Sequence, residues 1–287
     1  MNARAFALLA LVLLAAAAGA AREPAAADSP AADTLAADTL AADTSRNLVR
    51  DSWHGVKTLA HDTGHILVSP LRMGKRDALQ LGAILAATGV LMVFDEEIHA
   101  AFNRNAEEFP LQGMLEVGRF LDPVGYGSMN VYYLGGLGLS YLLRWEKGEA
   151  IFGEIITSFV VYGLLKVPVE TLVGRARPYQ DEGAYSFGND DATSFFSGHT
   201  VNVFQLATVL SHNVDSTIFD VAAWFGAACV GCQRIEADAH WPSDVFLSAA
   251  FAIAVSRGAI ALHEERQVAV RPTVGAEGVG MAVGWRF

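Results

Sequence analysis

The sequence is short of charge, of basic residues and of cysteine. Charged residues make up 18% of the 287 residues and hydrophobic ones 52%, a balance that favours a membrane protein or a heavily buried helical one. Lysine and arginine number 20 against 31 aspartate and glutamate, and the net charge of −11 argues against nucleic acid as a partner. A chain of this length can bury a full core and need hold only one domain.

The two cysteines, Cys229 and Cys232, lie inside an apolar run. A zinc or redox site would need further ligands or a polar loop at this place. We therefore expect both cysteines to be small core residues.

The N-terminal 45 residues look like a targeting signal and a linker. Residues 1–20 combine Arg4, a Leu/Ala-rich core and a small-residue cleavage site, and the core is shorter than the ~20 residues of a membrane-spanning helix. They predict a cleaved secretory signal peptide. Residues 21–45 form an acidic, repetitive stretch with almost no large apolar side chains, which predicts a disordered linker.

Residues 46–78 form an amphipathic segment that contains a pair of histidines four apart, His61 and His65. Such a pair could share a metal ion on one face of a helix. Gly64 weakens that helix and no third ligand is near, so we expect an exposed polar face instead.

Six apolar stretches follow, separated by polar breaks, and they are too long and unbroken for strands. The sequence therefore predicts an all-α fold with six helices over residues 79–265, either transmembrane or the core of a soluble bundle. The segment with Asp95, Glu96 and Glu97 predicts an acidic, solvated connection. Alternating residues near the C-terminus predict a β-hairpin appendage at 266–287. The six stretches are about 80–94, 131–143, 150–173, 200–211, 218–233 and 245–262.

Three polar clusters lie at ends of these predicted helices: residues 174–178, 194–199 and 234–244. In the last cluster, Pro242 favours the first turn of a helix. If the helices run up and down, the third ends where the fourth begins, and the fifth ends there too. All three clusters should then meet on one face of the bundle.

Together the clusters hold the groups that phosphoryl transfer requires. Arg177 and Arg234 can neutralise phosphate oxygens, and the helix start at Ser197 offers backbone N–H groups to an anion. Two histidines, His199 and His240, allow one to attack phosphorus while the other acts as acid. No acidic cluster lies among the motifs, so the expected chemistry does not require a metal ion or another cofactor.

The joint pattern resembles the superfamily of type-2 phosphatidate phosphatases and vanadium haloperoxidases, and in particular its bacterial membrane-associated phosphatases. Arg177-Pro178 matches the end of the first family motif, and Ser197-Gly198-His199 matches the second apart from its proline. Arg234, His240 and Asp244 match the third motif at the right spacing. The resemblance covers about residues 80–262 and implies a six-helix core and a phosphohistidine mechanism.

The resemblance also implies a role for each matched residue. His240 would be the nucleophile, Asp244 its orienting partner, and His199 the acid for the leaving alcohol. The implied phosphate-binding residues are Arg177, Arg234, Ser197 and Gly198.

The sequence departs from the family pattern at three positions. The family proline is Phe196, and the serine before the arginine is Gln233, which still offers hydrogen-bonding groups. The family lysine is Glu170, which reverses the charge where phosphate should be held.

The negative charge of Glu170 can be offset in several ways. Lys166 lies one helical turn earlier on the same face and could reach partway into the site. Alternatively the carboxyl group is protonated, turned away or paired with Arg175. The consequence could be altered substrate choice, lower activity or loss of catalysis.

We therefore expect a metal-independent phosphatase acting on a lipid phosphate, a lipid pyrophosphate or a related phosphomonoester. One alternative is a catalytically silent envelope protein that binds lipid headgroups, as Glu170 and the hairpin indicate. A minor alternative is a haloperoxidase that uses vanadate in the same pocket.

The expected location is the cell envelope, with membrane association and an outward, periplasmic site. Basic residues lie opposite the three clusters, and the positive-inside rule makes their side cytoplasmic. A cleaved signal conflicts with this orientation unless residues 46–78 re-enter or the bundle does not span. The basic residues are Arg72, Lys75, Arg76, Arg144 and Lys147.

Overall fold

The computed structural model describes residues 48–189, 192–275 and 278–285. The predicted signal peptide (1–20) and linker (21–45) lie outside the described residues. Within the described part of the chain, α-helices dominate, as the apolar stretches predicted.

Each of the six apolar stretches coincides with a helix of the structure. These helices are α3 (Lys75–Val93), α6 (Asn130–Leu143), α7 (Glu146–Val173), α8 (Gly198–Asn213), α9 (Thr217–Glu236) and α10 (Pro242–Gln267). Three further α-helices lie outside the predicted six: α2 (Leu48–Val68), α4 (Asp95–Asn105) and α5 (Leu111–Leu121). Short 3-10 turns complete the helical part: η1 (Ser69–Arg72), η2 (Asp122–Gly125), η3 (Gly127–Met129) and η4 (Pro178–Gln180).

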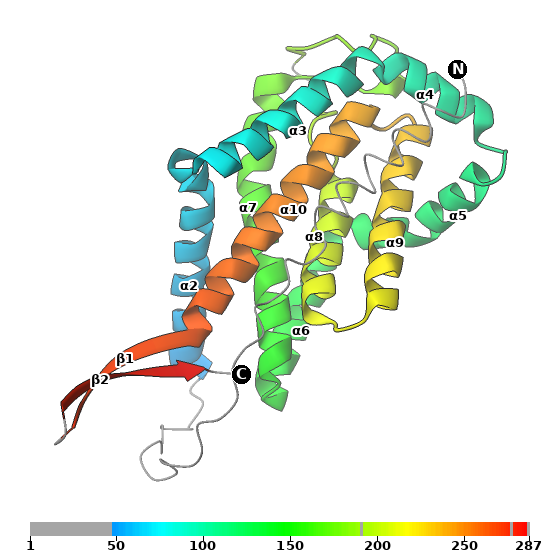
Figure 1. Cartoon of the computed structure of the whole chain (residues 1–287). Coiled ribbons are helices and arrows are strands. Elements are labelled where there is room, and N and C mark those ends of the chain that lie inside the picture. The colour runs from blue at the N-terminus through cyan, green and yellow to red at the C-terminus, as the bar shows by residue number, and fades with distance from the viewer. Residues whose placement is uncertain (1–47, 190–191, 276–277, 286–287) are drawn as a thin grey trace.

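Helices α7, α8, α9 and α10 form the centre of the molecule (Figure 1). Helix α10 contacts α7 and α8, and α9 packs between α8 and α5. Helix α2 lies beside α7 and contacts α10, and α3 packs against α10 (Figure 1). The main core cluster joins α4, α5, α8, α9 and α10 around Phe102, Leu115, Val201, Val230 and Val245.

The prediction of an acidic, solvated connection after the first apolar stretch is wrong. Residues 95–105 form helix α4, in which Asp95, Ile98 and Phe102 are buried while Glu96 and Glu97 are exposed. The buried positions recur at intervals of three and four residues, which is helical periodicity that the acidic side chains obscure.

Helix α2 is more closely attached to the bundle than an exposed polar segment would be. Asp62 is buried, and its Oδ1 lies 2.5 Å from Arg266 Nη1 on α10. The side chain of His61, by contrast, is 71% exposed, and its Nδ1 lies 3.2 Å from Asp62 Oδ1. The exposure of His61 agrees with the expected polar face, and the buried Asp62 beside it attaches α2 to α10.

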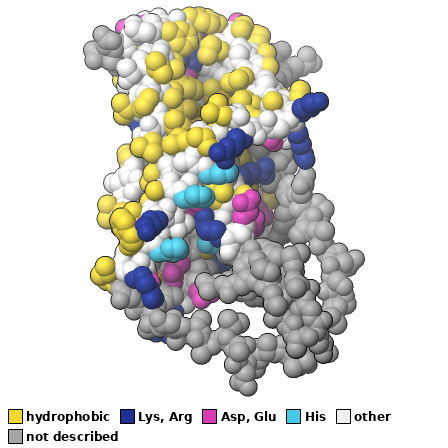
Figure 2. Space-filling model, turned by 90° about the vertical axis from the view of Figure 1, so that its left-hand side faces the viewer, with side chains coloured by type: hydrophobic (Ala, Val, Ile, Leu, Met, Phe, Trp, Pro, Cys, Tyr) yellow, Lys and Arg dark blue, Asp and Glu magenta, His cyan; other side chains and the backbone are white. Residues whose placement is uncertain are grey.

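Four helical segments are long and apolar enough to cross a membrane: Lys75–Val93, Glu146–Gln180, Thr217–Glu236 and Pro242–Arg266. Only 11% of the first window is buried inside the protein, so α3 presents apolar side chains outward. Figure 2 shows hydrophobic side chains gathered over the upper part of one face, with histidines and charged side chains below them. Such a face suits a lipid environment.

The buried cysteines match their prediction. Cys229 and Cys232 are free thiols on α9, 0% and 3% exposed, in the core between the helices.

The C-terminal segment leaves the end of α10 as two strands, β1 (Val268–Gly275) and β2 (Gly278–Trp285). They pair antiparallel, in a register from Val268 opposite Trp285 to Gly275 opposite Gly278. Figure 1 shows this pair extending away from the helices, at the end of α10 that is remote from residue 242.

Candidate active site

The three polar clusters lie together at one end of the bundle. Arg177 follows α7, and its Nη2 donates to the carbonyl oxygen of Thr193 (2.9 Å), in the segment that precedes α8. Its Nη1 lies 3.4 Å from the carbonyl oxygen of Ala239, between α9 and α10. The meeting of all three clusters, predicted from the up-and-down order of the helices, is therefore present in the structure.

The left-handed turn that ends α7 directs the chain into this site. Gly174 has a φ of 50°, and its N–H donates to the carbonyl oxygen of Glu170 (2.8 Å). A Cβ at this position would lie 2.7 Å from the backbone nitrogen of Asn189. Only glycine tolerates both the conformation and the close approach.

His240 is buried, with 3% of its surface exposed, directly before α10. Its Nδ1 lies 2.6 Å from the carbonyl oxygen of Ser194. Because a carbonyl can only accept, Nδ1 carries the proton and Nε2 keeps a free lone pair. Burial, followed by the nearby charge of Arg177, lowers the pKa of His240 well below its ordinary value. The ring is therefore neutral and able to act as a nucleophile.

Asp244 is connected to His240 through Ser194. The group that holds the His240 ring nitrogen is the Ser194 carbonyl, and the Ser194 hydroxyl donates to Asp244 Oδ2 (2.5 Å). The same Oδ2 accepts the backbone N–H of Trp241 (3.1 Å). The Asp244 carboxylate therefore caps the start of α10, and its orienting role, implied by the family resemblance, would pass through Ser194.

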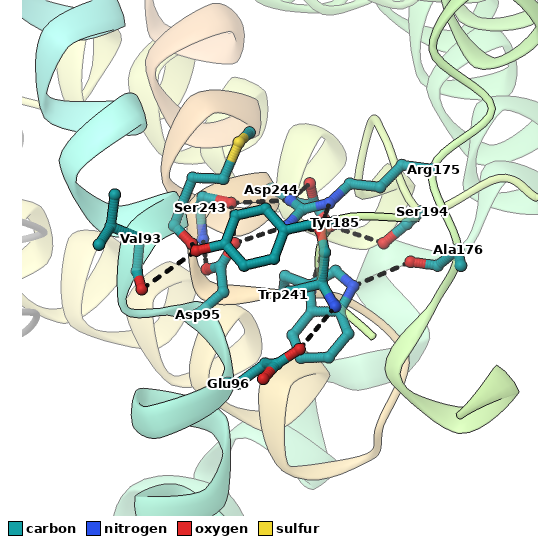
Figure 3. A network of polar contacts seen from close by, with 12 residues as sticks. Val93, Asp95, Glu96, Arg175, Ala176, Tyr185, Ser194, Trp241, Ser243 and Asp244 are labelled. Carbon is teal, nitrogen blue, oxygen red and sulfur yellow. Dashed lines mark hydrogen bonds and ion pairs between the residues drawn. The ribbon is translucent and has the colours of Figure 1, made fainter. Parts of the chain in front are cut away.

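A buried network of ion pairs and hydrogen bonds around Arg175 holds Asp244 in place (Figure 3). The guanidinium of Arg175 is 1% exposed and lies 2.6 Å from both Asp95 Oδ2 and Asp244 Oδ1. It also donates to the hydroxyl of Ser243 (2.8 Å) and to the carbonyl oxygen of Ala184. Burial raises the pKa of Asp95, while hydrogen bonds from Ser243 and Arg175 oppose that rise.

Sequence reasoning missed Asp95 and the role of Arg175 in this network. Arg175 was considered as a partner for Glu170, but it pairs with Asp95 and Asp244 instead. The helical spacing of Asp95 with Ile98 was the available signal that this carboxylate faces inward.

Helix α4 also holds the loop that carries His240. His99 Nε2 lies 2.6 Å from Asp238 Oδ1, and Asn103 donates to the same oxygen (2.9 Å). The Trp241 indole donates to the carbonyl oxygen of Ala176 (2.8 Å). The nucleophile loop is therefore fixed by α4 on one side and by the segment after α7 on the other.

His199 lies in the first turn of α8 with 22% of its side chain exposed. Its Nε2 lies 3.7 Å from Asp122 Oδ1, and its ring packs edge-on against Tyr126. Burial, followed by the charge of Arg234, lowers the pKa of His199, whereas Asp122 raises it. Asp122 is a second residue that sequence reasoning missed, since it lies in a 3-10 turn outside the three motifs.

The predicted phosphate-binding residues differ in the contacts that they already make within the protein. Arg234 lies 2.7 Å from Asp122 Oδ1, and its Nε donates to Gln233 Oε1 (2.7 Å). Ser197 is fully buried, with its hydroxyl 2.8 Å from Thr200 Oγ1 and its N–H donating to Ser248. Ser197 therefore anchors the start of α8, and we expect its contribution to phosphate binding to be indirect.

Gly198 allows a tyrosine to approach the site. A Cβ on this residue would lie 2.9 Å from the hydroxyl oxygen of Tyr162 on α7. The Tyr162 hydroxyl is one of five buried polar atoms around the site that make no hydrogen bond within the described part of the chain, and one of the five, Asp122 Oδ1, lies in the ion pair with Arg234. A ligand with several oxygens would supply acceptors for the donors among these atoms, the tyrosine hydroxyl, the guanidinium and a protonated imidazole, but not for a carboxylate oxygen. The other three atoms are Glu170 Oε1, Arg177 Nε and His199 Nε2.

Each of the three departures from the family pattern has a structural setting, and that of Gln233 is the hydrogen bond that it accepts from Arg234. Glu170 is 8% exposed, and its Oε2 lies 2.8 Å from Lys166 Nζ, so among the open alternatives its partner is Lys166 and not Arg175. Phe196 is buried and packs against Phe251, with ring centroids 4.6 Å apart.

Among the described residues, no group of three or more His, Cys, Asp or Glu side chains could hold a metal ion.

Comparison with known proteins identifies similar sequences. Residues 150–267 match the family model of the PAP2 superfamily, the type-2 phosphatidic acid phosphatases. A lipid A 1-phosphatase of Rhizobium johnstonii is 29% identical over 141 residues, covering 44% of this chain and 56% of that protein. A lipid A 1-phosphatase of Rhizobium etli is 33% identical over 139 residues, covering 43% and 58%. The matched region thus spans little more than half the length of these curated relatives.

Two solved structures are also similar. LpxE of Aquifex aeolicus is 24% identical with a TM-score of 0.43, covering 58% of this chain and 95% of that one. A transmembrane PAP2 type phosphatidylglycerolphosphate phosphatase of Bacillus subtilis is 18% identical with a TM-score of 0.43, covering 64% and 95%.

Proposed function

We propose that this chain is a member of the type-2 phosphatidic acid phosphatase superfamily, whose family model matches residues 150–267, and that it releases phosphate from a phosphorylated lipid through a phosphohistidine intermediate. The observation that carries the proposal is His240, a buried neutral histidine whose Nε2 is free while Nδ1 is held by a carbonyl. Arg177, Arg234 and His199 lie around it as charge and acid.

The chemistry follows from these groups. His240 Nε2 attacks phosphorus, the bond to the leaving oxygen breaks, and His199 gives its proton to that oxygen. Water then attacks the phosphohistidine, giving a proton back to His199 as the P–N bond breaks. Arg177 and Arg234 stabilise the charge that develops on the phosphoryl oxygens.

Two observations favour a lipid substrate: the apolar helices around the site and the names of the similar proteins. Four helical segments are apolar enough to cross a membrane, so a lipid-anchored phosphate could reach the site from the bilayer. The two Rhizobium relatives are named as lipid A 1-phosphatases. We place the substrate among phosphate monoesters and pyrophosphates of envelope lipids, with the site facing outward.

The test is phosphate release by the purified full-length protein in detergent. The panel contains phosphatidate, an isoprenyl pyrophosphate and lipid A, each assayed beside His240→Ala. We expect wild-type turnover on at least one substrate and a loss of roughly a thousandfold or more in His240→Ala. A folded wild-type protein that releases no phosphate from the whole panel contradicts the proposal.

Glu170 favours a second candidate, a weakly active or silent protein that binds lipid headgroups. A carboxylate stands where the family lysine would hold phosphate, and the only described cation that pairs with it is Lys166. Glu170→Lys separates the two functions. A large rise in turnover would show that the native site is impaired, whereas unchanged turnover on an active protein would exclude this second candidate.

A further inference from the structure

The 3-10 turn η2 places one carboxylate beside two groups of the proposed catalytic machinery. Asp122 Oδ1 lies 2.7 Å from Arg234 Nη2 and 3.7 Å from His199 Nε2. The side chain of Asp122 is 18% exposed. Asp122 comes from outside residues 150–267, so it belongs neither to the three motifs nor to the matched family region.

The turn that carries Asp122 is fitted closely to His199. The carbonyl oxygen of Gly125 accepts a hydrogen bond from Asn202 (2.6 Å), one turn after His199 on α8. A Cβ on Gly125 would lie 2.6 Å from Cδ2 of the His199 ring. Tyr126 covers another edge of the same ring, with centroids 4.9 Å apart. These contacts fix the position of Asp122 relative to the imidazole.

The charges that face His199 explain why a carboxylate is needed there. A general acid must carry its proton before the leaving oxygen departs, but two guanidinium groups nearby disfavour an imidazolium. Burial is the main cause that lowers the pKa of His199, the guanidinium groups add to it, and Asp122 is the carboxylate that opposes both. The groups that face His199 are Asp122 and Tyr126 from the segment after α5, Arg234 from α9, Arg177 after α7, and His240 before α10.

We propose that Asp122 is a positioning residue that holds His199 as the proton donor to the leaving group and fixes Arg234 beside it. The inference rests on the proposed phosphatase function. As His240 attacks, the bond between phosphorus and the leaving oxygen breaks and its electron pair goes to that oxygen. The proton on His199 Nε2 then moves to the oxygen. Asp122 supplies a counter-charge to the imidazolium and transfers no proton itself.

Leaving groups of different basicity test this role. An alkoxide needs a proton to depart, whereas p-nitrophenolate leaves without one. The experiment compares kcat/KM on octyl phosphate and on p-nitrophenyl phosphate for wild type, Asp122→Asn and Asp122→Glu. His199→Gln serves as the reference for a lost general acid, and thermal unfolding confirms that each variant is folded.

We expect kcat/KM of Asp122→Asn to fall roughly tenfold or more on octyl phosphate but less than about threefold on p-nitrophenyl phosphate. The larger loss is a part of the roughly hundredfold or larger rate effect of general acid catalysis. The alkaline limb of its pH profile on octyl phosphate should move to lower pH, because loss of the carboxylate lowers the pKa of His199. Asp122→Glu should recover part of the octyl phosphate activity.

Equal losses on both substrates would overturn the proposal, because they would show that Asp122 acts only through Arg234 or through the fold. Unchanged activity in Asp122→Asn would overturn it as well. If Asp122→Asn does not fold, the same comparison is made with Asp122→Glu. The longer side chain should lower kcat/KM on octyl phosphate more than kcat/KM on p-nitrophenyl phosphate. Failure of wild type on both substrates and on the lipid panel would instead count against the proposed function.

Discussion

The carboxylate of Asp95 and the guanidinium of Arg175 lie 2.6 Å apart although they are 80 residues apart in the sequence. Both side chains are buried, 0% and 1% exposed, and Arg175 also pairs with Asp244. The pair therefore ties α4 to the start of α10, where the proposed nucleophile lies. Stability and activity should both depend on it.

Arg175→Met should strongly destabilise the protein. The change leaves Asp95 and Asp244 buried without their cation, and breaking a buried ion pair costs about 3–5 kcal/mol. Thermal or denaturant unfolding in detergent measures the loss. The control is Arg119→Met, which breaks a 2.7 Å pair with Glu236 at the surface and should cost about 0–1 kcal/mol. Equal effects of the two variants would contradict this account of the network.

The same network predicts that the stability of the folded protein depends on pH. Burial raises the pKa of Asp95 in the folded state, so the folded protein binds a proton more readily than the unfolded chain does. This group therefore favours folding at low pH and loses that contribution as pH rises through its raised pKa. Without Arg175 the two carboxylates should be harder still to ionise. The stability gap between wild type and Arg175→Met should therefore narrow as pH falls, in unfolding experiments at several pH values.

Ser194→Ala should impair His240 while leaving its carbonyl partner in place. The variant removes the hydroxyl that donates to Asp244 and keeps the backbone oxygen that accepts from His240. A buried hydrogen bond to a charged group is worth about 1.5–3 kcal/mol, so we expect a loss of that order in stability and reduced turnover. Ser256→Ala is the matched control, because the buried Ser256 hydroxyl on α10 makes no hydrogen bond in the described part of the chain. It should be neutral or stabilising.

Gly125→Ala should lower activity because the new Cβ would lie 2.6 Å from the His199 ring. Displacement of the proposed acid should cost about a hundredfold in turnover of an alkyl phosphate, within the usual range for general acid catalysis. Gly127→Ala changes the next glycine, where a Cβ meets no atom within 4 Å, and should retain activity. Steady-state assays of both variants decide the matter, and a fully active Gly125→Ala would show that His199 tolerates the shift.

Glu170→Gln and Lys166→Gln should change KM in opposite directions. The Glu170 carboxylate disfavours an incoming phosphate, and the Lys166 ammonium 2.8 Å away offsets it. Removing the carboxylate should lower KM by up to about tenfold, equivalent to about 1.4 kcal/mol, and removing the ammonium should raise it. Michaelis–Menten analysis on one lipid phosphate tests both. Parallel shifts in the two variants would show that the pair does not act on the phosphate.

The sequence by itself determined the helical fold class and the residues that form the proposed phosphate site. Apolar stretches of this length without turn residues favour helices over strands, and the six predicted stretches coincide with helices. The up-and-down order of those helices also placed Arg177, His199 and His240 together. That inference needs only connectivity, because short connections return neighbouring helix ends to the same side.

Only the tertiary structure decided which partner each polar group takes. Asp95 looked like part of a solvated segment, yet it is the buried partner of Arg175, and Asp122 gave no signal before its turn was placed beside His199. Glu170 could have paired with either of two cations, and it pairs with Lys166. Such choices depend on distances of a few ångströms and on exclusion of water between residues far apart in the chain, which sequence spacing does not encode.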